Sequence, residues 1–258
     1  MIPASIGRVL VIAALLQVQS VQAQLLRTAL FIGNSYTAVN NLPLIVHDIA
    51  ASTGDTLFYD ASTPGGYSLQ AHSTNANTLS FIAQGGYDFM VLQEQSQRPA
   101  LPLADVASLT LPYARLLDSL ARVHDPCVET VFYRTWGRKN GDASLCPTWP
   151  PVCTYAGMDS LLALRYRMMA DSNDAFLAPV GDVWKYLRMY HPSIELYDND
   201  ESHPSAAGSY AAAMTFYTVF FRKDPLQVSY DYSLIPNDAA IIRNAVKHVV
   251  YDSLITWN

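Results

Sequence analysis

Charged residues are scarce in this sequence of 258 residues, since only 15% are Asp, Glu, Lys or Arg. The 16 basic residues are outnumbered by 22 acidic ones and form no run. Proteins that bind nucleic acid or an anionic membrane surface usually present a basic patch, so we expect neither as a partner. Half of the residues are apolar, which is enough for a large buried core and is not typical of a disordered chain.

Long apolar runs are also missing beyond the N-terminus, so no membrane span is expected in residues 24–258. At the N-terminus itself, Arg8 precedes an apolar run over residues 9–16 and then small and polar residues. This run is shorter than the roughly 20 residues that cross a bilayer. Val-Gln-Ala at 21–23 fits the small-residue rule of signal-peptidase cleavage. We therefore predict a signal peptide over residues 1–23 and a secreted or periplasmic protein.

Cysteine is rare too, with three residues, and none of them is spaced with a histidine in the way of a zinc site. Cys146 and Cys153 enclose a short loop that contains three prolines. Because export favours oxidation, we predict a disulfide between them. Cys127 is then expected to be buried and free. The alternative is that all three thiols are reduced.

Strand-like and helix-like segments alternate along residues 24–258. Apolar runs typical of buried parallel strands lie at 27–33, 56–62, 87–95, 129–137 and in the first part of 175–184. Helical patterns lie at 41–53, 69–84, 102–124, 158–172, 204–221 and 238–255. Because right-handed crossovers join parallel strands, this alternation predicts a single α/β domain with helices on both faces of a parallel sheet.

Polar or glycine-rich turns follow all of the expected strands. They occupy residues 33–37, 63–68, 93–97, 135–138 and 179–184. Parallel strands bring their carboxyl ends to one edge of the sheet, and α/β sheets bind ligands at that edge. We therefore expect a functional site there.

Ser35 lies in the first of these turns, between a strand and a helix. In this place its own N–H and the helix N-terminus would face a ligand. A serine is also a favoured helix cap, so the turn alone leaves both interpretations open.

A polar segment at 197–210 carries Asp200 and His203, three residues apart. A nucleophilic serine needs a base within hydrogen-bond reach, and the base needs an acceptor that fixes its tautomer. Asp200 is expected to orient His203 while the other ring nitrogen meets Ser35, and Asp198 is the alternative acid. The other interpretation is an exposed acidic loop with an incidental histidine.

Attack on an ester carbonyl also requires hydrogen-bond donors for the oxyanion that forms. The expected backbone donors are the N–H groups of Ser35 and Gly66, with Gly65 as the alternate, because glycine permits unusual dihedral angles and close approach. The expected side-chain donor is the amide of Gln93, with Gln95 as the alternate. The glycine pair is otherwise an ordinary turn.

Aromatic residues in or beside the strand-end turns are candidates for the wall of a sugar or acyl pocket. These are Tyr36, Tyr67, Trp136 and Trp184. Large aromatic residues are buried more often than not, so membership of the core is the alternative for each.

Taken in order along the chain, these segments resemble the SGNH (GDSL-like) hydrolases. Residues 33–35 (Gly-Asn-Ser) match the first block of that family, Gly65-Gly66 the glycine block, and 200–203 (Asp-Glu-Ser-His) the last block. The third block departs from the usual Gly-x-Asn-Asp, because residues 92–97 read Leu-Gln-Glu-Gln-Ser-Gln. That stretch is closer to the Gln-Gly-Glu-Ser region of the sialate O-acetylesterase and acetylxylan-esterase branches.

The resemblance implies a flavodoxin-like, three-layer αβα sandwich whose five parallel strands are in the order 2-1-3-4-5. It implies a catalytic triad of Ser35, His203 and Asp200 without metal or cofactor. The expected function is hydrolysis of carboxylic esters through an acyl-enzyme, with short acyl groups on carbohydrates as substrates. The alternatives are a lipase or arylesterase on longer or aryl esters, an acyltransferase, and a non-catalytic glycan-binding protein of the same fold.

Overall fold

A parallel five-stranded sheet lies at the centre of the computed structural model, which describes residues 23–257. The strands are β1 (Leu26–Ile32), β2 (Thr56–Ser62), β3 (Phe89–Leu92), β4 (Glu129–Tyr133) and β5 (Phe176–Ala178). Their order is β2-β1-β3-β4-β5, and all four neighbouring pairs are parallel, which confirms the predicted fold. Apart from Ala23, the predicted signal peptide lies outside the described residues.

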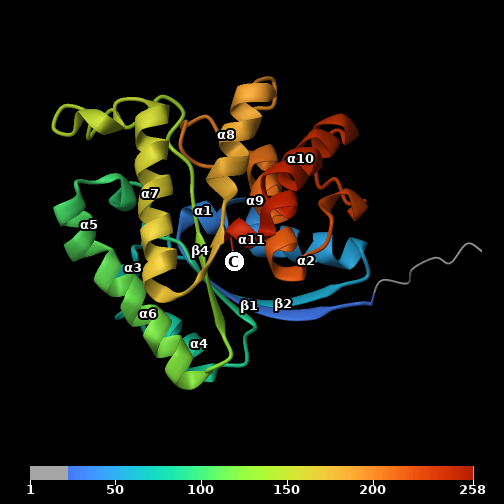
Figure 1. Ribbon diagram of the computed structural model, residues 1–258, viewed down its shortest axis with the longest axis horizontal. Coiled ribbons are helices and arrows are strands. Elements are labelled where there is room, and N and C mark those ends of the chain that lie inside the picture. Colours follow the sequence, from blue (N-terminus) through green and yellow to red (C-terminus); the bar gives the residue numbers. More distant parts are fainter. Residues whose placement is uncertain (1–22, 258) are drawn as a thin grey trace, which may run out of the picture.

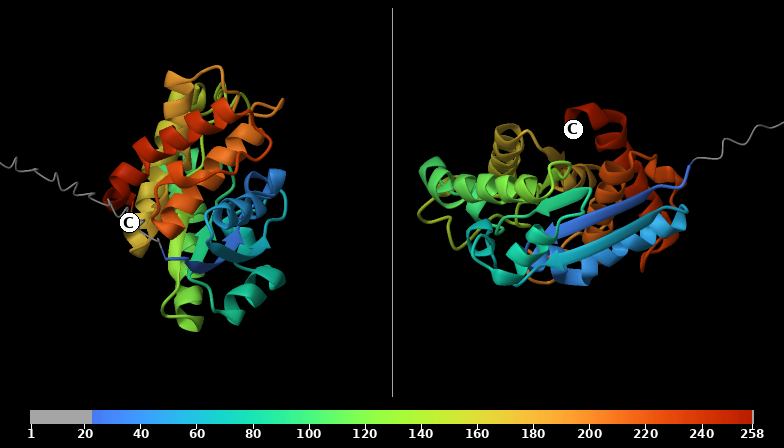
Figure 2. Two further views of the ribbon diagram at one scale, coloured as in Figure 1. Left: turned by 90° about the vertical axis from the view of Figure 1, so that its right-hand side faces the viewer. Right: turned by 90° about the horizontal axis from the view of Figure 1, so that it is seen from below.

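Helices cover both faces of the sheet (Figures 1 and 2). They are α1 (Ser35–Ala38), α2 (Leu42–Ser52), α3 (Leu69–His72), α4 (Ala76–Gln84), α5 (Leu103–Leu109), α6 (Leu111–His124), α7 (Tyr155–Asn173), α8 (Val180–Tyr190), α9 (Ala206–Phe221), α10 (Pro236–Val249) and α11 (Leu254–Trp257). One core cluster joins the sheet to α4, α6 and α7, and the other joins it to α2, α8, α9 and α10.

The first strand shows why the sequence forms this sandwich. Successive side chains of a strand point to opposite faces, so Leu30 and Ile32 enter one cluster while Ala29 and Phe31 enter the other. All four are at most 1% exposed. A strand that is apolar on both faces belongs in the middle of a sheet covered by two helical layers.

Several element boundaries differ from the prediction. The helix expected at 102–124 is divided into α5 and α6 at Thr110, because Pro112 lacks an N–H and cannot continue a helix. The helix expected at 69–84 is divided into α3 and α4 by Asn75, whose side chain caps α4. The segment after β5, expected to be a loop, forms α8.

Two strands are also shorter than expected. β4 ends at Tyr133 rather than at 137, because its neighbour β5 has three residues and ends opposite Tyr133. β3 ends at Leu92, and residues 93–95 already belong to the turn. The residues that follow Leu92 and Tyr133 are therefore not held in the sheet by strand pairing.

A long insertion between β4 and α7 contains a disulfide. Cys146 and Cys153 are joined, with their Cα atoms 4.7 Å apart. The insertion packs against the segment after β3, since the Trp149 indole N–H donates to the carbonyl of Ala100 over 2.9 Å. Cys127 is free but exposed, so the prediction of a buried thiol is wrong. It lies in the turn after α6, where its N–H donates to a carboxylate oxygen of Asp125.

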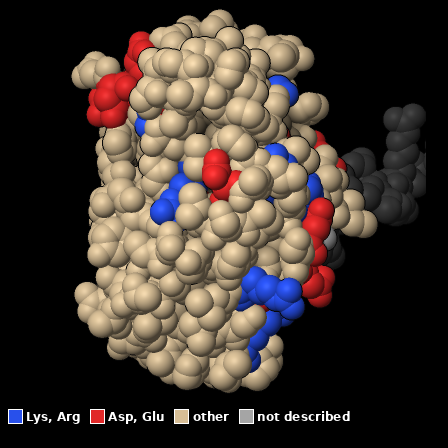
Figure 3. All heavy atoms as spheres, turned by 90° about the vertical axis from the view of Figure 1, so that its left-hand side faces the viewer, with Lys and Arg blue, Asp and Glu red and all other residues tan. Residues whose placement is uncertain are grey.

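Charged side chains are scattered among uncharged ones on the face drawn in Figure 3. Between residues 23 and 257, no helix combines the length and hydropathy that crossing a membrane requires. The same described residues contain no group of three or more His, Cys, Asp or Glu side chains arranged to hold a metal ion.

Candidate active site

The nucleophile turn begins where β1 ends. Asn34 caps α1, since its side-chain oxygen accepts the N–H of Tyr36 over 3.1 Å. Ser35 is therefore the first residue of α1 rather than its N-cap, and its hydroxyl is not used to cap the start of the helix. Gly33 is required beside it, because a Cβ there would lie 2.5 Å from the hydroxyl of Thr37 and 2.6 Å from the side-chain oxygen of Gln93.

A hydrogen-bonded chain joins three side chains that the sequence predicted to meet. The Ser35 hydroxyl lies 2.8 Å from Nε2 of His203, although the two residues are 168 positions apart. Nδ1 of His203 lies 2.5 Å from Oδ2 of Asp200. Asp198 instead accepts the N–H of Asn199 and does not take the place of Asp200. With Nδ1 donating to the carboxylate, Nε2 is left as an acceptor for the serine proton.

Asp200 is held as an anion by its surroundings. Partial burial acts to raise its pKa, but hydrogen bonds from the His203 ring, the His203 N–H and the Ser202 N–H hold the pKa below its ordinary value. The carboxylate thus remains charged at neutral pH and can stabilise an imidazolium beside it.

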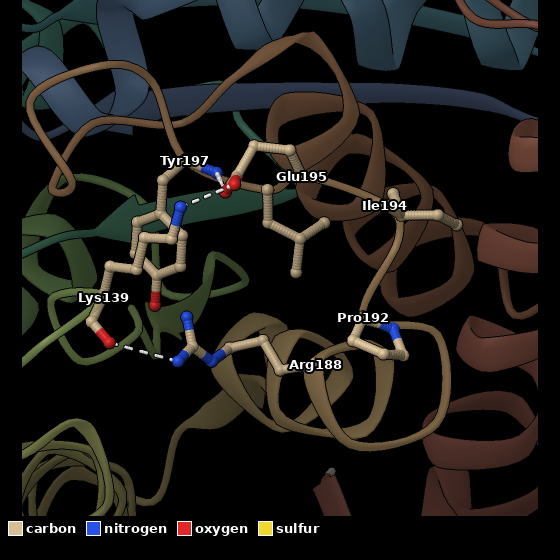
Figure 4. A pocket seen from close by; sticks show the side chains of 7 residues that line it. Lys139, Arg188, Pro192, Ile194, Glu195 and Tyr197 are labelled. Atoms are coloured by element: carbon tan, nitrogen blue, oxygen red, sulfur yellow. Dashed lines mark hydrogen bonds and ion pairs between the residues drawn. The ribbon is translucent and has the colours of Figure 1, made fainter.

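The segment that carries Asp200 and His203 is tied to residues after β4. The Trp136 indole donates to the carbonyl of Ser202 over 3.0 Å, and the Lys139 N–H donates to the carbonyl of Glu201 over 2.9 Å. Lys139 also lines a cavity of about 170 Å³, where it forms an ion pair with Glu195 (Figure 4). These contacts fix the position of the imidazole.

Two backbone donors near the serine have no acceptor among the described residues, namely the N–H groups of Ser35 and Gly66. Gly66 has a φ of +72°, a value that glycine adopts readily. The side chain of Asn34 donates to the carbonyl of Tyr67 over 2.9 Å and so ties the glycine turn to the nucleophile turn. Free N–H groups at two linked turns are what an oxyanion hole requires.

The two glutamines do not have the geometry expected of an oxyanion donor. Gln93 is wholly buried, and its side-chain oxygen accepts the N–H of Asn34 over 2.9 Å while its amide N–H donates to the carbonyl of Glu94. Gln95 is bonded to Gln97 and to the N–H of Arg98 within its own turn. Gln93 was predicted as a donor to the oxyanion, whereas its buried amide nitrogen donates to the carbonyl of Glu94 and its oxygen supplies the acceptor that the buried N–H of Asn34 needs.

Three of the four predicted pocket aromatics are in the core. Tyr36 stacks on Trp136 with ring centroids 4.9 Å apart, and Trp136 stacks on Trp184 at 3.6 Å. None of these rings is more than 2% exposed, so the prediction that they form a pocket wall is wrong. Their role is to support the site, since the Tyr36 hydroxyl lies 2.6 Å from that of Ser202. Tyr67 alone keeps part of its surface exposed.

Two buried residues that support the site, His72 and Glu94, were not predicted from the sequence. His72 is fully buried, and Nε2 donates to the carbonyl of Gly33 over 2.8 Å while Nδ1 bonds the hydroxyl of Thr78. Desolvation lowers the pKa of His72, so the ring stays neutral. Glu94 accepts the N–H of Leu69 at the start of α3 over 3.1 Å. The polar run after β3 was a signal for Glu94, whereas nothing in the sequence distinguishes His72.

No protein-family model and no curated protein matches the sequence, whereas solved structures do. A candidate SGNH hydrolase from Slackia heliotrinireducens is 27% identical, with a TM-score of 0.60 over 74% of this chain and 97% of its own. A DUF4886 family protein from Bacteroides uniformis is 15% identical, with a TM-score of 0.74 over 89% and 95%. The acetyl xylan esterase AlAXEase is 11% identical, with a TM-score of 0.53 over 74% and 98%. The last two likenesses concern the fold alone.

Proposed function

Because this chain has the fold of the SGNH hydrolases, we propose that it is a serine esterase that cleaves carboxylic esters through an acyl-enzyme. The observation that supports this most is the hydrogen-bonded chain from Ser35 through His203 to Asp200. A protein that only binds glycans has no need of a serine hydroxyl held against an imidazole whose second nitrogen meets a carboxylate.

In the first half of the proposed reaction, the Ser35 oxygen attacks the ester carbonyl carbon while Nε2 of His203 takes the hydroxyl proton. The negative charge that develops on the carbonyl oxygen is held by the N–H groups of Ser35 and Gly66. Asp200 stabilises the imidazolium. The C–O bond to the alcohol then breaks, and the proton on His203 passes to the leaving oxygen.

The second half repeats these steps with water. His203 takes a proton from a water molecule, whose oxygen attacks the acyl carbon on Ser35. The oxyanion forms again in the same place, the bond to Ser35 breaks, and the proton on His203 returns to the serine oxygen. The acid is released, and the enzyme regains its starting protonation state.

For the substrate we propose short acyl groups, acetyl above all, on carbohydrates. The proposal is supported by the resemblance of the third sequence block to acetylxylan and sialate O-acetylesterases, and by the signal-like N-terminus. We also propose that the protein is secreted or periplasmic. A comparison of acetyl, octanoyl and palmitoyl p-nitrophenyl esters separates this substrate class from that of a lipase, which would prefer the long chains.

The central test is Ser35→Ala, compared with Ser108→Ala on the exposed surface of α5. We expect Ser35→Ala to lower kcat for p-nitrophenyl acetate by 10³-fold or more, because the nucleophile is lost. Ser108→Ala should leave kcat unchanged. A fluorophosphonate probe should label the wild type and fail to label Ser35→Ala.

Retained turnover in Ser35→Ala would contradict the proposal. Absence of both turnover and labelling in the wild type would instead favour a non-catalytic binding protein. Thermal unfolding of both variants should match the wild type, which excludes loss of activity through misfolding.

A further inference from the structure

A hollow of about 530 Å³ opens at the carboxyl end of β2, beside the glycine turn and against the first half of α4. The residues that matter in its lining are Ser62, Thr63, Asn75, Asn77, Ser80 and Phe81. None of the described residues that line it is charged. The hollow takes no part in the proposed chemistry. Its uncharged lining of hydroxyl and amide groups therefore suggests a separate binding role.

Several polar groups in this lining are without a partner. Asn75 uses its side-chain oxygen to accept the N–H of Thr78, and its amide nitrogen donates to no described residue. The amide of Asn77 and the hydroxyls of Thr63 and Ser80 likewise have no hydrogen-bond partner among residues 23–257. Each of these groups is available to a ligand.

The chemistry of the lining selects a class of ligand. Amides and hydroxyls together offer both donors and acceptors but no charge. Sugar hydroxyls are donors and acceptors as well, and a neutral sugar has no charge to be left unpaired. An anion would need a cation here, and an apolar ligand would leave these groups unbonded, which costs free energy. Phe81 adds one apolar ring to the lining, against which the C–H face of a sugar could pack.

The hollow adjoins the proposed catalytic groups. Pro64 lines it and precedes Gly66 by two residues, so their Cα atoms lie at most about 7 Å apart. On the other side, the carbonyl of Ser62 accepts the N–H of Gly33 in the nucleophile turn over 3.0 Å. A ligand that occupies the hollow therefore lies next to both the glycine turn and the nucleophile turn.

We propose that this hollow is a subsite for neutral sugar units next to the esterified unit of an oligosaccharide. The inference rests on the proposed function, since it makes that function specific for oligosaccharide rather than monosaccharide or aryl esters. Asn77 and Ser80, one turn apart on the exposed surface of α4, are the specificity residues.

The test uses Asn77→Ala/Ser80→Ala in the full chain, with Ser108→Ala/Asn244→Ala as the matched control. The control removes one exposed asparagine and one exposed serine from helices that do not line the hollow. Initial rates are measured with p-nitrophenyl acetate and with acetylated xylotetraose. We expect the pocket variant to raise KM for acetylated xylotetraose about tenfold, the effect of losing two hydrogen bonds, with unchanged kinetics on p-nitrophenyl acetate. The control variant should change neither.

Calorimetric binding of unacetylated xylotetraose and cellotetraose provides a second measurement, which needs no catalysis. The wild type should bind at least one of them, and the pocket variant should bind it about tenfold more weakly. If the wild type hydrolyses acetates but the variant keeps its KM, the subsite is wrong and the esterase proposal remains. If the wild type hydrolyses nothing, the esterase proposal fails, and binding decides on the subsite separately. Failure to bind either tetrasaccharide overturns the subsite.

Discussion

Asp198 and Asp200 are two positions apart in one exposed segment, but their carboxylates have different neighbours. Oδ2 of Asp200 contacts the His203 ring, and Oδ1 accepts two backbone N–H groups. Asp198 accepts the N–H of the next residue in the chain. Only Asp200 can set the tautomer of His203, and this geometry separates two acids that the sequence left as alternatives.

We expect Asp200→Asn to lower kcat for p-nitrophenyl acetate by on the order of 10²-fold or more, because an amide can favour the wrong tautomer and cannot stabilise an imidazolium. Asp198→Asn is the matched control and should change kcat less than twofold. Steady-state rates of both variants, with circular dichroism as a check of folding, measure this. Equal losses in the two variants would mean that Asp200 does not act through His203.

For single residues, the sequence predicted the contacts that follow from short spacing along the chain and from position at a strand end. Asp200 and His203 are close along the chain, and Ser35 follows a buried strand, so their meeting follows from the parallel sheet. The role of Gln93 could not be predicted in the same way. An amide has a donor and an acceptor end, and the end used depends on the buried N–H of Asn34, which is remote in sequence.

Helix α9 links the core to the catalytic segment. Its first half is rich in small residues, and Gly208 in its first turns packs directly on the segment before Asp200. A Cβ at Gly208 would collide with the carbonyl oxygen of Leu196 and with the ring of Trp184. The helix can therefore approach that closely only with glycine at this position.

Gly208→Ala should lower the free energy of unfolding by about 1–3 kcal/mol, the usual cost of overpacking a core. It should also reduce esterase activity, because Leu196 and the segment that follows it must move. Gly65→Ala is the control for stability, since a Cβ there meets nothing within 4 Å. Urea denaturation measures the stability of both variants, and the rate of p-nitrophenyl acetate hydrolysis measures the activity of Gly208→Ala. A stability of Gly208→Ala equal to that of the wild type would show that α9 can shift without cost.

Element boundaries were predicted less well than element types, and the reasons are physical. The break at Thr110 had a local signal in Pro112, whereas the early end of β4 depends on the length of its neighbour β5. α8 was missed because Pro179, Gly181 and Asp182 directly after β5 are typical of a turn. The helix there is stabilised by packing against α9 and α10, which lie far along the chain.

A buried carboxyl group, that of Glu94, makes the stability of the whole molecule depend on pH. Burial raises the pKa of Glu94 to about 7, against hydrogen bonds from the N–H groups of Gln95 and Leu69 and the charge of Arg98. Its Oε2 atom has no partner among the described residues. Between pH 4.5 and about 7 the folded state thus binds more protons than the unfolded state, and stability falls as the pH rises.

Glu94→Gln should remove this loss. The amide oxygen can still accept both N–H groups, and no charge needs to be buried. At pH 8 we expect the free energy of unfolding of the variant to exceed that of the wild type by up to about 3 kcal/mol, and at pH 5 to be nearly equal. Glu129→Gln, at the partly exposed start of β4, is the control. Denaturation at both pH values measures the difference, and the same difference at both would mean that Glu94 does not change protonation in this range.

The outward position of the histidine and its acid has a consequence for the fate of the acyl group. The side chains of His203 and Asp200 are 32% and 49% exposed. An acyl group on Ser35 would stand in contact with bulk solvent, and water at its full concentration would compete with any sugar alcohol for it. We therefore expect release of free acid to dominate over transesterification, and added ethanol to divert product only in proportion to its molar share of the solvent.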